Sequence, residues 1–195
     1  MTAPARMVEA SDADIIGESR HQPERFAAIF DRHFSEVHRY VERRLGGDIA
    51  DDIASDTFLT AFGKRDSYDT SRPDARPWLY GIATNLVGKH RRRQTSALRA
   101  YRLAATTDTL GGHEDQVAAR VSAQRRRGEL VHALARLSPG EQDVLFLVAL
   151  AEFTHQEVAE ALGISYGTVG SRLSRARAKL SRHLGQPTSP GTEKD

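Results

Sequence analysis

The chain has 195 residues, of which 28 are Lys or Arg and 26 are Asp or Glu, so its formal net charge is +2. It contains no cysteine, which excludes disulfides, thiol catalysis and cysteine-ligated zinc. No apolar run approaches the about 18 residues of a membrane-spanning helix, and the N-terminus lacks the basic and apolar segments of a signal peptide. We therefore expect a cytoplasmic protein without membrane insertion of its own.

The distribution of charge is more informative than its sum. Acidic residues gather near the N-terminus and again between residues 48 and 74, whereas basic residues gather at 89–93, 125–127 and 172–182. Such segregation predicts an acidic surface for one partner and basic surfaces for a polyanion.

The first half of the chain predicts three helices after a mobile leader. Residues 1–20 show no sustained periodicity, and apolar residues then keep helical spacing over 23–45. A second helix begins at Asp48 and has one acidic face. The polar loop 63–74 leads into a third helix, which is apolar at first and densely cationic at 89–93.

The second half predicts a linker and a further helical unit. Residues 96–114 are rich in Thr, Ser, Ala, Asp and Gly, which is typical of a flexible linker. A strongly apolar helix is predicted to begin after Ser138, which can act as its N-cap, with Glu141 three residues later. Residues 185–195 are expected to be a disordered tail. Since no alternating pattern indicates a sheet, the fold class is all-α, with two small helical domains joined by a flexible linker.

Residues 154–184 predict a helix-turn-helix. Thr154 and Glu157 can form a capping box, Gly163 suits a positive φ at the helix end, and Ser165 can cap the second helix. The second helix has an apolar stripe and an otherwise cationic surface, so it fits a major groove. The alternative is an ordinary helical hairpin with a solvated basic face.

The sequence carries no enzyme signature. Neither a phosphate-loop glycine pattern nor HExxH is present. His113-Glu114 and His155 with Glu157 lack a third ligand, so we expect neither a metal nor a cofactor. The helical spacing of Trp78 with the apolar residues around it favours a core position over a ligand platform.

With these motifs the chain resembles the extracytoplasmic-function (ECF, group 4) RNA polymerase sigma factors of the sigma-70 family, which keep only the domains called region 2 and region 4. The resemblance covers about residues 24–94 and 130–184. DIADDIASDTFLTAF resembles the acidic second helix of the family, and PWLYGIATNLVGKHRRR resembles its Trp-Leu…Ile-Ala-x-Asn helix with a basic end. In the second half, GTVGSRLSRARAKL is the most specific string. The resemblance implies region 2 at 21–95 and region 4 at 115–184.

The resemblance implies a subunit that binds RNA polymerase core (the β′ clamp and the β subunit), reads promoter DNA and helps to open it. The acidic helix would dock on the clamp, through Asp51, Asp52, Ile53, Asp56, Phe58 and Leu59. Ser55 departs from the family there, where a Gln is common.

The loop before the Trp helix would capture a base flipped from the nontemplate strand of the −10 element, with Tyr68 as the stacking platform. The −10 contacts implied are Lys64, Arg65, Tyr68, Trp78, Asn85, Lys89, Arg91, Arg92 and Arg93.

Region 4 would read the double-stranded −35 element, and Arg172 or Arg175 is expected to contact a guanine. The −35 contacts implied are Ser165, Tyr166, Thr168, Val169, Ser171, Arg172, Arg175, Arg177 and Lys179. Gly81 and Gly170 stand where relatives often carry long polar or basic residues, so the resemblance does not fix the promoter sequence. It also implies an anti-sigma factor as a partner.

Two other functions compete with this interpretation. A stand-alone helix-turn-helix regulator would bind operator DNA as a dimer, and it would need a ligand or dimerisation domain at residues 24–94. A pure interaction protein with a decayed DNA module would direct no promoter-dependent transcript.

Overall fold

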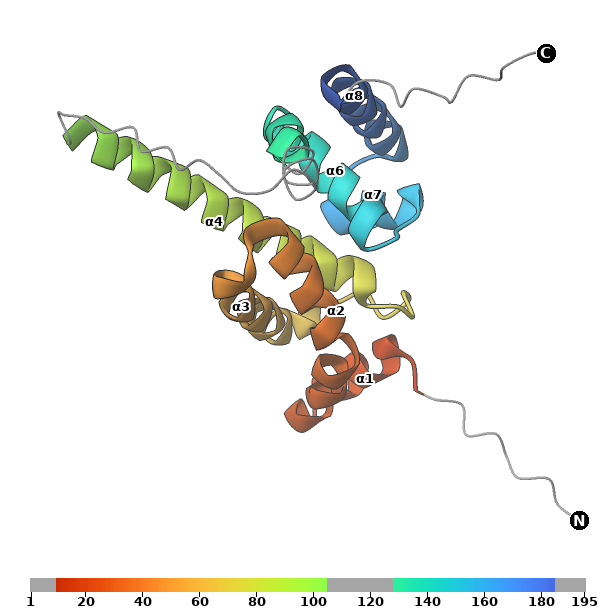
Figure 1. Ribbon diagram of the computed structural model, residues 1–195. Helices are drawn as coiled ribbons and strands as arrows, with labels where there is room; N and C mark the ends of the chain where they lie inside the picture. Colours follow the sequence, from red (N-terminus) through yellow and green to blue (C-terminus); the bar gives the residue numbers. More distant parts are fainter. Residues whose placement is uncertain (1–9, 105–127, 185–195) are drawn as a thin grey trace, which may run out of the picture.

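The computed structural model describes residues 10–104 and 128–184, with the backbone alone at 98–104. We call residues 10–104 the first unit and residues 128–184 the second unit. These residues contain helices and connecting turns and no strand, which agrees with the all-α expectation (Figure 1). The first unit holds α1 (Asp12–Ser19), α2 (Ala27–Leu45), α3 (Ala50–Gly63) and α4 (Arg76–Ala104), and the second holds α6 (Pro139–Leu150), α7 (His155–Leu162) and α8 (Tyr166–Leu184). Short 3-10 turns lie at Pro23–Phe26, Gly47–Ile49 and Arg65–Ser67.

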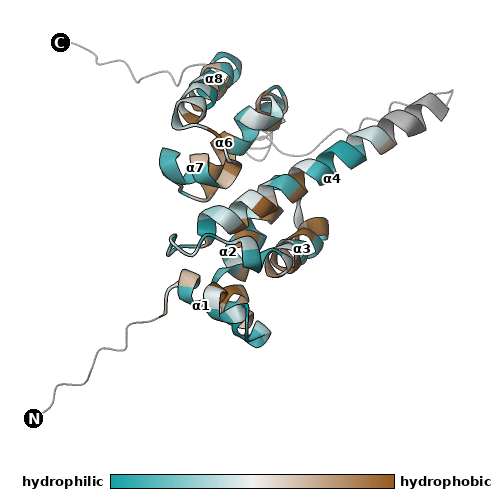
Figure 2. Ribbon diagram, turned by 180° about the vertical axis from the view of Figure 1, so that it is seen from behind, coloured by the Kyte–Doolittle hydropathy of each residue, from teal (hydrophilic) through white to brown (hydrophobic). Residues whose placement is uncertain are grey.

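Helices α2, α3 and α4 pack around one apolar core in the first unit. Val37 and Val41 of α2 meet Leu79, Ala83 and Val87 of α4, and all five side chains are fully buried. Figure 2 shows apolar residues of α4 where α2 and α3 lie beside it, and hydrophilic residues further along the helix. Helix α4 therefore begins in the core and leaves it as its sequence becomes cationic.

Two boundaries differ from those expected from the sequence. The expected mobile leader 1–20 includes helix α1, whose Ile15 and Ile16 are buried in the core of the first unit. The helix was missed because its apolar run is short, although Ser11 and Asp14 form a complete capping box. Helix α4 also runs through residue 96, the expected start of the linker, to Ala104.

Several expected features lie outside the described residues. These are the remainder of the linker from 105, the basic cluster 125–127, the pair His113-Glu114 and the tail 185–195.

The second unit has the helix ends that its sequence predicts. Ser138 with Glu141 and Thr154 with Glu157 form capping boxes at the starts of α6 and α7. Gly163 ends α7 with φ of 61°, in the left-handed region where glycine carries no steric cost. The Ser165 hydroxyl accepts a hydrogen bond from the Thr168 amide at the start of α8. These local contacts fix the angle between α7 and α8.

The two units share one continuous apolar core. Helix α7 lies across α4 (Figure 1), and the rings of Tyr80 and Phe153 meet with their centroids 5.0 Å apart. Gly81 of α4 faces the backbone of Ala161, and a Cβ at this glycine would lie only 2.3 Å from the Ala161 carbonyl oxygen. Only a glycine permits so close an approach, which accounts for the departure from the family pattern at residue 81.

A buried polar network also joins the units. The Arg44 side chain is 2% exposed and donates to the Asp143 carboxylate at 2.6 Å and to the Tyr40 hydroxyl at 2.9 Å. Arg91 donates to the Arg44 carbonyl at 2.6 Å and to the Gln142 side chain. Burial opposes the charge on Arg44, but the neighbouring Tyr40 and Asp143 raise its pKa above the ordinary value. Arg44 therefore stays charged between the two units.

Candidate nucleic-acid interface

Four of the residues predicted to contact the −10 element line one pocket. Lys64 and Tyr68 come from the loop between α3 and α4, and Trp78 and Asn85 come from α4 itself. The pocket has a volume of about 310 Å³, and Glu160 and Ala161 of α7 form part of its wall. The fold thus brings the predicted base-contacting side chains together and lays the second unit against them.

Tyr68 is not the open stacking platform that the sequence predicted. Its side chain is buried, its ring lies against that of Trp78 with centroids 4.8 Å apart, and its hydroxyl donates to the Arg72 carbonyl at 2.6 Å. Burial and the nearby carboxylates of Asp12 and Asp74 raise the pKa of Tyr68 to about 12, so the phenol stays protonated. Trp78 is only partly exposed and Asn85 is exposed. Of the four predicted −10 residues in the pocket, Lys64, Trp78 and Asn85 are therefore accessible, and Tyr68 supports them from the core.

The predicted cations of the −10 side divide into engaged and exposed groups. Arg65 donates to the carbonyls of Ser19 and Phe62 and stacks on the Phe62 ring at 4.1 Å, while Arg91 is held in the network between the units. Both guanidinium groups are thus engaged within the protein in this arrangement, which the sequence did not predict. The exposed cations are Lys64, Lys89, Arg92 and Arg93.

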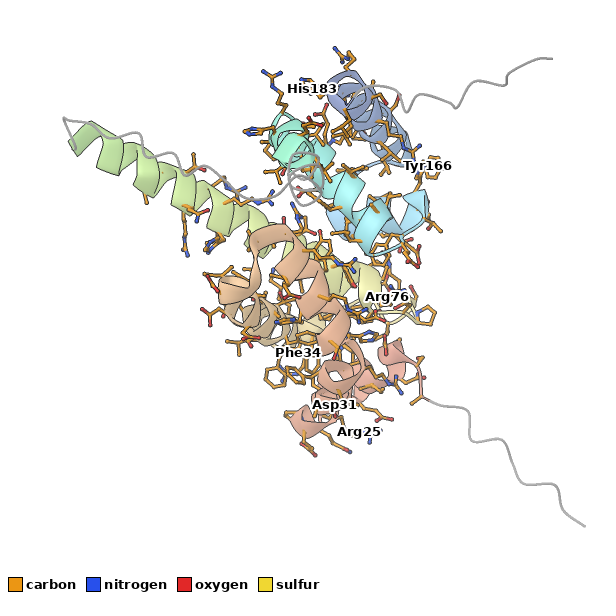
Figure 3. The ribbon with its side chains drawn as sticks, viewed as in Figure 1. Arg25, Asp31, Phe34, Arg76, Tyr166 and His183 are labelled. Carbon is orange, nitrogen blue, oxygen red and sulfur yellow. The ribbon has the colours of Figure 1, made fainter. Side chains whose placement is uncertain are left out.

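Helix α8 presents an open N-terminal surface. Tyr166 is 60% exposed and lies at the start of the helix, beside the His155 ring at 5.6 Å (Figure 3). Val169 is fully buried, so the predicted DNA contact is corrected to a core position. The remaining predicted −35 residues are exposed or partly exposed: Ser165, Thr168, Ser171, Arg172, Arg175, Arg177 and Lys179.

Three of these cations contact the start of α6, and Arg175 makes the longest contact, 4.0 Å from the Glu141 carboxylate. Lys179 donates to the Glu141 carboxylate at 2.7 Å, and this bond and the Ser138 amide lower the pKa of Glu141. Arg172 lies over Gly140, where its guanidinium would be 2.9 Å from an added Cβ. Lys179 therefore orients α8 on α6, and Arg175 and Arg177 are the more exposed cations of the helix.

The acidic face of α3 is accessible as predicted from the sequence. Asp51, Asp52 and Asp56 are exposed, and Leu59 beside them is 69% exposed. Ile53 and Phe58 are buried, so these two predicted polymerase contacts support the surface from below. Phe58 packs against a stack formed by Phe30 and Phe34 of α2 (Figure 3).

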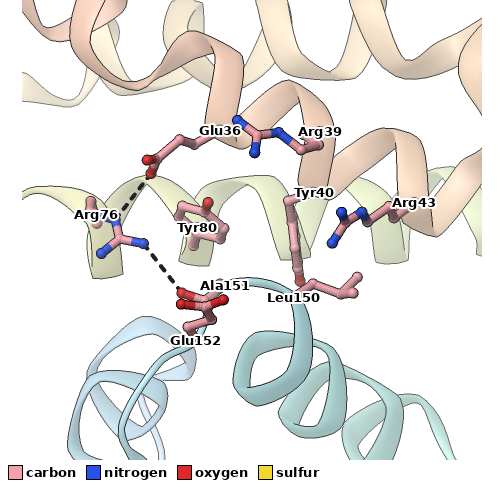
Figure 4. Close-up of a pocket in the computed structure, with 9 residues that line it drawn as sticks. All are labelled: Glu36, Arg39, Tyr40, Arg43, Arg76, Tyr80, Leu150, Ala151 and Glu152. Carbon is pink, nitrogen blue, oxygen red and sulfur yellow. Dashed lines mark hydrogen bonds and ion pairs between the residues drawn. The ribbon is translucent and has the colours of Figure 1, made fainter.

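A second, polar pocket of about 240 Å³ lies between the two units (Figure 4). Arg76 of α4 pairs with Glu36 at 3.3 Å, donates to the Ala151 carbonyl at 3.3 Å and lies over the Phe153 ring. The neighbouring Glu152 has φ of 57° and is the one non-glycine residue with positive φ in the described ranges. The turn between α6 and α7 is thus held on α4 by Arg76.

In the part of the chain that the structure describes, no three His, Asp or Glu side chains come together as metal ligands. None of the helices described is long and apolar enough to span a membrane.

Sequence reasoning missed the residues between the units. Arg44 resembles an ordinary cation in the last turn of a helix, and Asp143 an ordinary exposed acid. The one available signal was Gly81, a costly residue in the middle of a helix.

The comparisons with known proteins agree with this geometry. Residues 29–97 match the family model of Sigma-70 region 2, and residues 127–180 match that of Sigma-70, region 4. The chain is 34% identical over 139 residues to the RNA polymerase sigma factor NccH of Alcaligenes xylosoxydans xylosoxydans, which covers 69% of this chain and 72% of the relative. It is 32% identical over 167 residues to the ECF RNA polymerase sigma factor SigL of Mycobacterium tuberculosis, covering 84% of this chain and 91% of the relative.

The chain belongs to the ECF RNA polymerase sigma factors. Among solved structures, CnrH in complex with the cytosolic domain of CnrY aligns with a TM-score of 0.61 at 26% identity, over 91% of this chain and 99% of that chain. RpoE in complex with the anti-sigma factor NepR from Bartonella quintana aligns with a TM-score of 0.59 over 83% of this chain and 98% of that chain. At 22% identity this second likeness concerns the fold alone. The first unit is therefore region 2 of a sigma factor and the second is region 4.

Proposed function

We propose that this sigma factor binds RNA polymerase core, directs it to promoters by reading the −35 and −10 elements, and helps to open the DNA. It would act as a dissociable subunit in the cytoplasm, without chemistry of its own. The observation that carries the proposal is the pocket where Lys64, Tyr68, Trp78 and Asn85 converge. A regulator that binds only double-stranded operator has no use for such a pocket.

Core polymerase would bind at the acidic face of α3. Asp51, Asp52 and Asp56 give this face its charge, and the exposed Leu59 offers an apolar anchor within it. An apolar centre with a charged surround is the usual composition of a protein interface. Buried Ile53 and Phe58 would keep the helix surface in shape.

Promoter opening would take place at the pocket beside α4. Extracting a base from the duplex costs a few kcal/mol, and stacking on an aromatic side chain returns about 1–3 kcal/mol per base. Trp78 would provide the stacking face, and the Asn85 amide has the donor and acceptor that adenine requires. Lys64, Lys89, Arg92 and Arg93 would hold phosphates of the same strand.

The −35 element would be read by the start of α8. Ser165, Tyr166 and Thr168 lie at its exposed N-terminal end, where a recognition helix meets base edges. Arg172 or Arg175 would pair with a guanine, and Arg177 would contact a phosphate.

The arrangement of the two units favours regulation by closure. Helix α7 lies against the −10 pocket, and Glu160 pairs with Arg72 of the loop at 3.4 Å. We propose that core polymerase separates the units and that an anti-sigma factor keeps the free protein inactive. The solved CnrH and RpoE structures are both complexes, RpoE with an anti-sigma factor.

Run-off transcription with purified core polymerase tests this proposal. The protein should direct initiation at discrete sites, and the mapped starts should share two upstream elements. Tight binding to duplex operator without core, and no initiation with it, would instead support the stand-alone regulator. A failure to bind either DNA or core would leave only an interaction protein.

A further inference from the structure

Helix α1 contacts the −10 loop but does not line the pocket. We define the −10 loop as residues 64–75, between the end of α3 and the start of α4. Helix α1 lies before residue 29, where the match to the region 2 family model begins. Two polar side chains at its two ends, Asp12 and Arg20, reach the two ends of this loop.

Asp12 holds the end of the loop. Its carboxylate accepts a hydrogen bond from the Ala75 amide at 3.1 Å, just before α4 begins. The same carboxylate accepts from His33 at 2.7 Å and from Arg32 at 3.0 Å, and its side chain is 9% exposed. Asp12 therefore ties α1, α2 and the loop together at one buried point.

Arg20 holds the start of the loop. Its guanidinium donates to the Tyr68 carbonyl at 2.7 Å and, over a longer 3.4 Å, to the Arg65 carbonyl. Arg65 returns a bond to the Ser19 carbonyl at 3.2 Å, so the helix end and the loop hold each other. Hydrogen bonds with a charged donor are stronger than neutral ones. The Tyr68 backbone is thus fixed from the outer side.

The side chain of Tyr68 forms the inner wall of the −10 pocket. Its ring supports Trp78, and its hydroxyl closes the loop on the Arg72 carbonyl. A shift of the Tyr68 backbone would therefore move the aromatic wall against which a base must fit. Arg20 itself does not line the pocket.

We propose that helix α1 is a specificity element of this sigma factor, with Arg20 as the positioning residue that presets the −10 loop for base capture. The inference rests on the proposed function, because it assigns a role in reading the nontemplate strand. A preset loop loses less conformational freedom on binding, so the correct base is held more tightly. Without Arg20 the loop would adopt several shapes and accept different bases more equally.

The test compares holoenzymes formed from core polymerase and each sigma variant. The probe is a short single-stranded DNA with the −10 sequence of a promoter mapped by run-off transcription, and its competitor is the same DNA with the captured base changed. Arg20→Ala should reduce the preference for the correct base by about tenfold, the effect of losing one charge-assisted hydrogen bond. Arg20→Lys keeps a donor for the Tyr68 carbonyl and should retain most of the preference.

Arg25→Ala is the matched control. Arg25 follows α1 by a few residues, pairs with Glu18 of the same helix at 2.7 Å, and is 47% exposed. The contacts described for Arg25 are with Glu18 and not with the loop, so its removal should leave base preference unchanged. Preference at the −35 element should also be unchanged in every variant, because the contacts described for α1 are with α2, the turn that precedes α2 and the −10 loop.

The outcomes separate this inference from the proposed function. If wild type fails to initiate with core polymerase, the proposed function fails, whatever Arg20 does. If wild type initiates, and Arg20→Ala lowers the affinity for both DNAs equally or for neither, then helix α1 has only a structural role and the inference is wrong. Should Arg20→Ala melt below the assay temperature, Arg20→Gln replaces it in the same comparison and is judged by the same two results.

Discussion

The two surfaces proposed to read DNA differ in how much of each is open. On the −10 side, α7 lies against the pocket, and Arg65, Arg72 and Arg91 are bound to other groups of the protein. On the −35 side, the start of α8 faces outward, with Tyr166 60% exposed. Single-strand capture needs a shaped pocket, which can be covered, whereas duplex reading needs only an exposed helix. Under the proposed function, closure of the units would therefore restrict the −10 step more than the −35 step.

The largest expected effect comes from breaking the network that keeps the −10 side covered. Arg44→Ala removes the donor of the partly exposed Asp143 carboxylate and one hydrogen bond of the buried Tyr40 hydroxyl, which should lower the free energy of unfolding by about 3 kcal/mol. Urea denaturation measures this loss, and small-angle scattering should show the two units farther apart. Arg43→Ala, at the exposed neighbouring residue, is the control and should change stability little. A loss below about 1 kcal/mol for Arg44→Ala would contradict the role given to the network.

The second effect concerns the support of the −10 loop and depends on pH. Burial alone would raise the pKa of Asp12, but hydrogen bonds from His33, the Ala75 amide and Arg32 lower it from 3.8 to about 2. The depressed pKa contributes about 2.4 kcal/mol to stability above pH 4, and this contribution is lost as the pH falls through about 2.

Denaturation curves between pH 7 and 2 test the role of Asp12. Asp12→Asn should be less stable than wild type at pH 7, and the gap should shrink by about 2 kcal/mol at pH 2. Parallel curves would mean that the carboxylate is not held as described.

A third change uncovers the −10 pocket through packing instead of charge. Gly81→Ala places a Cβ 2.3 Å from the Ala161 carbonyl oxygen, so α7 has to move away from α4. Such overpacking typically destabilises the closed arrangement by about 2 kcal/mol. If the closed arrangement restricts the pocket, the affinity of the free protein for a −10 single strand would rise by up to roughly thirtyfold. Fluorescence anisotropy with that DNA measures the gain.

Gly88→Ala serves as the control for this change. Gly88 lies on the same helix, and its added Cβ would meet only the flexible end of Arg92 at 3.4 Å. An unchanged or reduced affinity in Gly81→Ala, with Gly88→Ala as wild type, would show that α7 does not restrict the pocket.

The smallest effect has the opposite sign and concerns the open side. At Gly170 of α8 an added Cβ meets nothing within 4 Å, so Gly170→Ala should stabilise the helix by up to about 1 kcal/mol. Thermal denaturation would show a slightly higher melting temperature, and the affinity for the −10 strand should not change. The same substitution at Gly81 and Gly170 thus distinguishes the covered surface from the open one.

Local features of the fold could be predicted from the sequence, and contacts between distant segments could not. The capping boxes at Ser138 and Thr154 and the positive φ of Gly163 depend on a few neighbouring residues, and all are present as expected. The Arg44–Asp143 pair joins residues 99 positions apart, and neither residue has a local signal. The family resemblance implies that Tyr68 is a stacking platform, but the ring of Tyr68 packs on that of Trp78, a contact without a local signal.

Helix α4 carries both the contact with α7 and the proposed strand-reading residues Trp78 and Asn85, so under the proposed function α7 and the DNA strand would compete for this helix. With such competition, the apparent dissociation constant for the strand would equal the intrinsic one divided by the fraction of molecules whose units are separated. A separated population of roughly one in a hundred would weaken observed binding about a hundredfold. Linkage is reciprocal: a partner that holds the two units apart would increase the affinity for the promoter by a certain factor, and the promoter would increase the affinity for that partner by the same factor. Cooperation between polymerase and promoter would then require no direct contact between the surfaces that bind them.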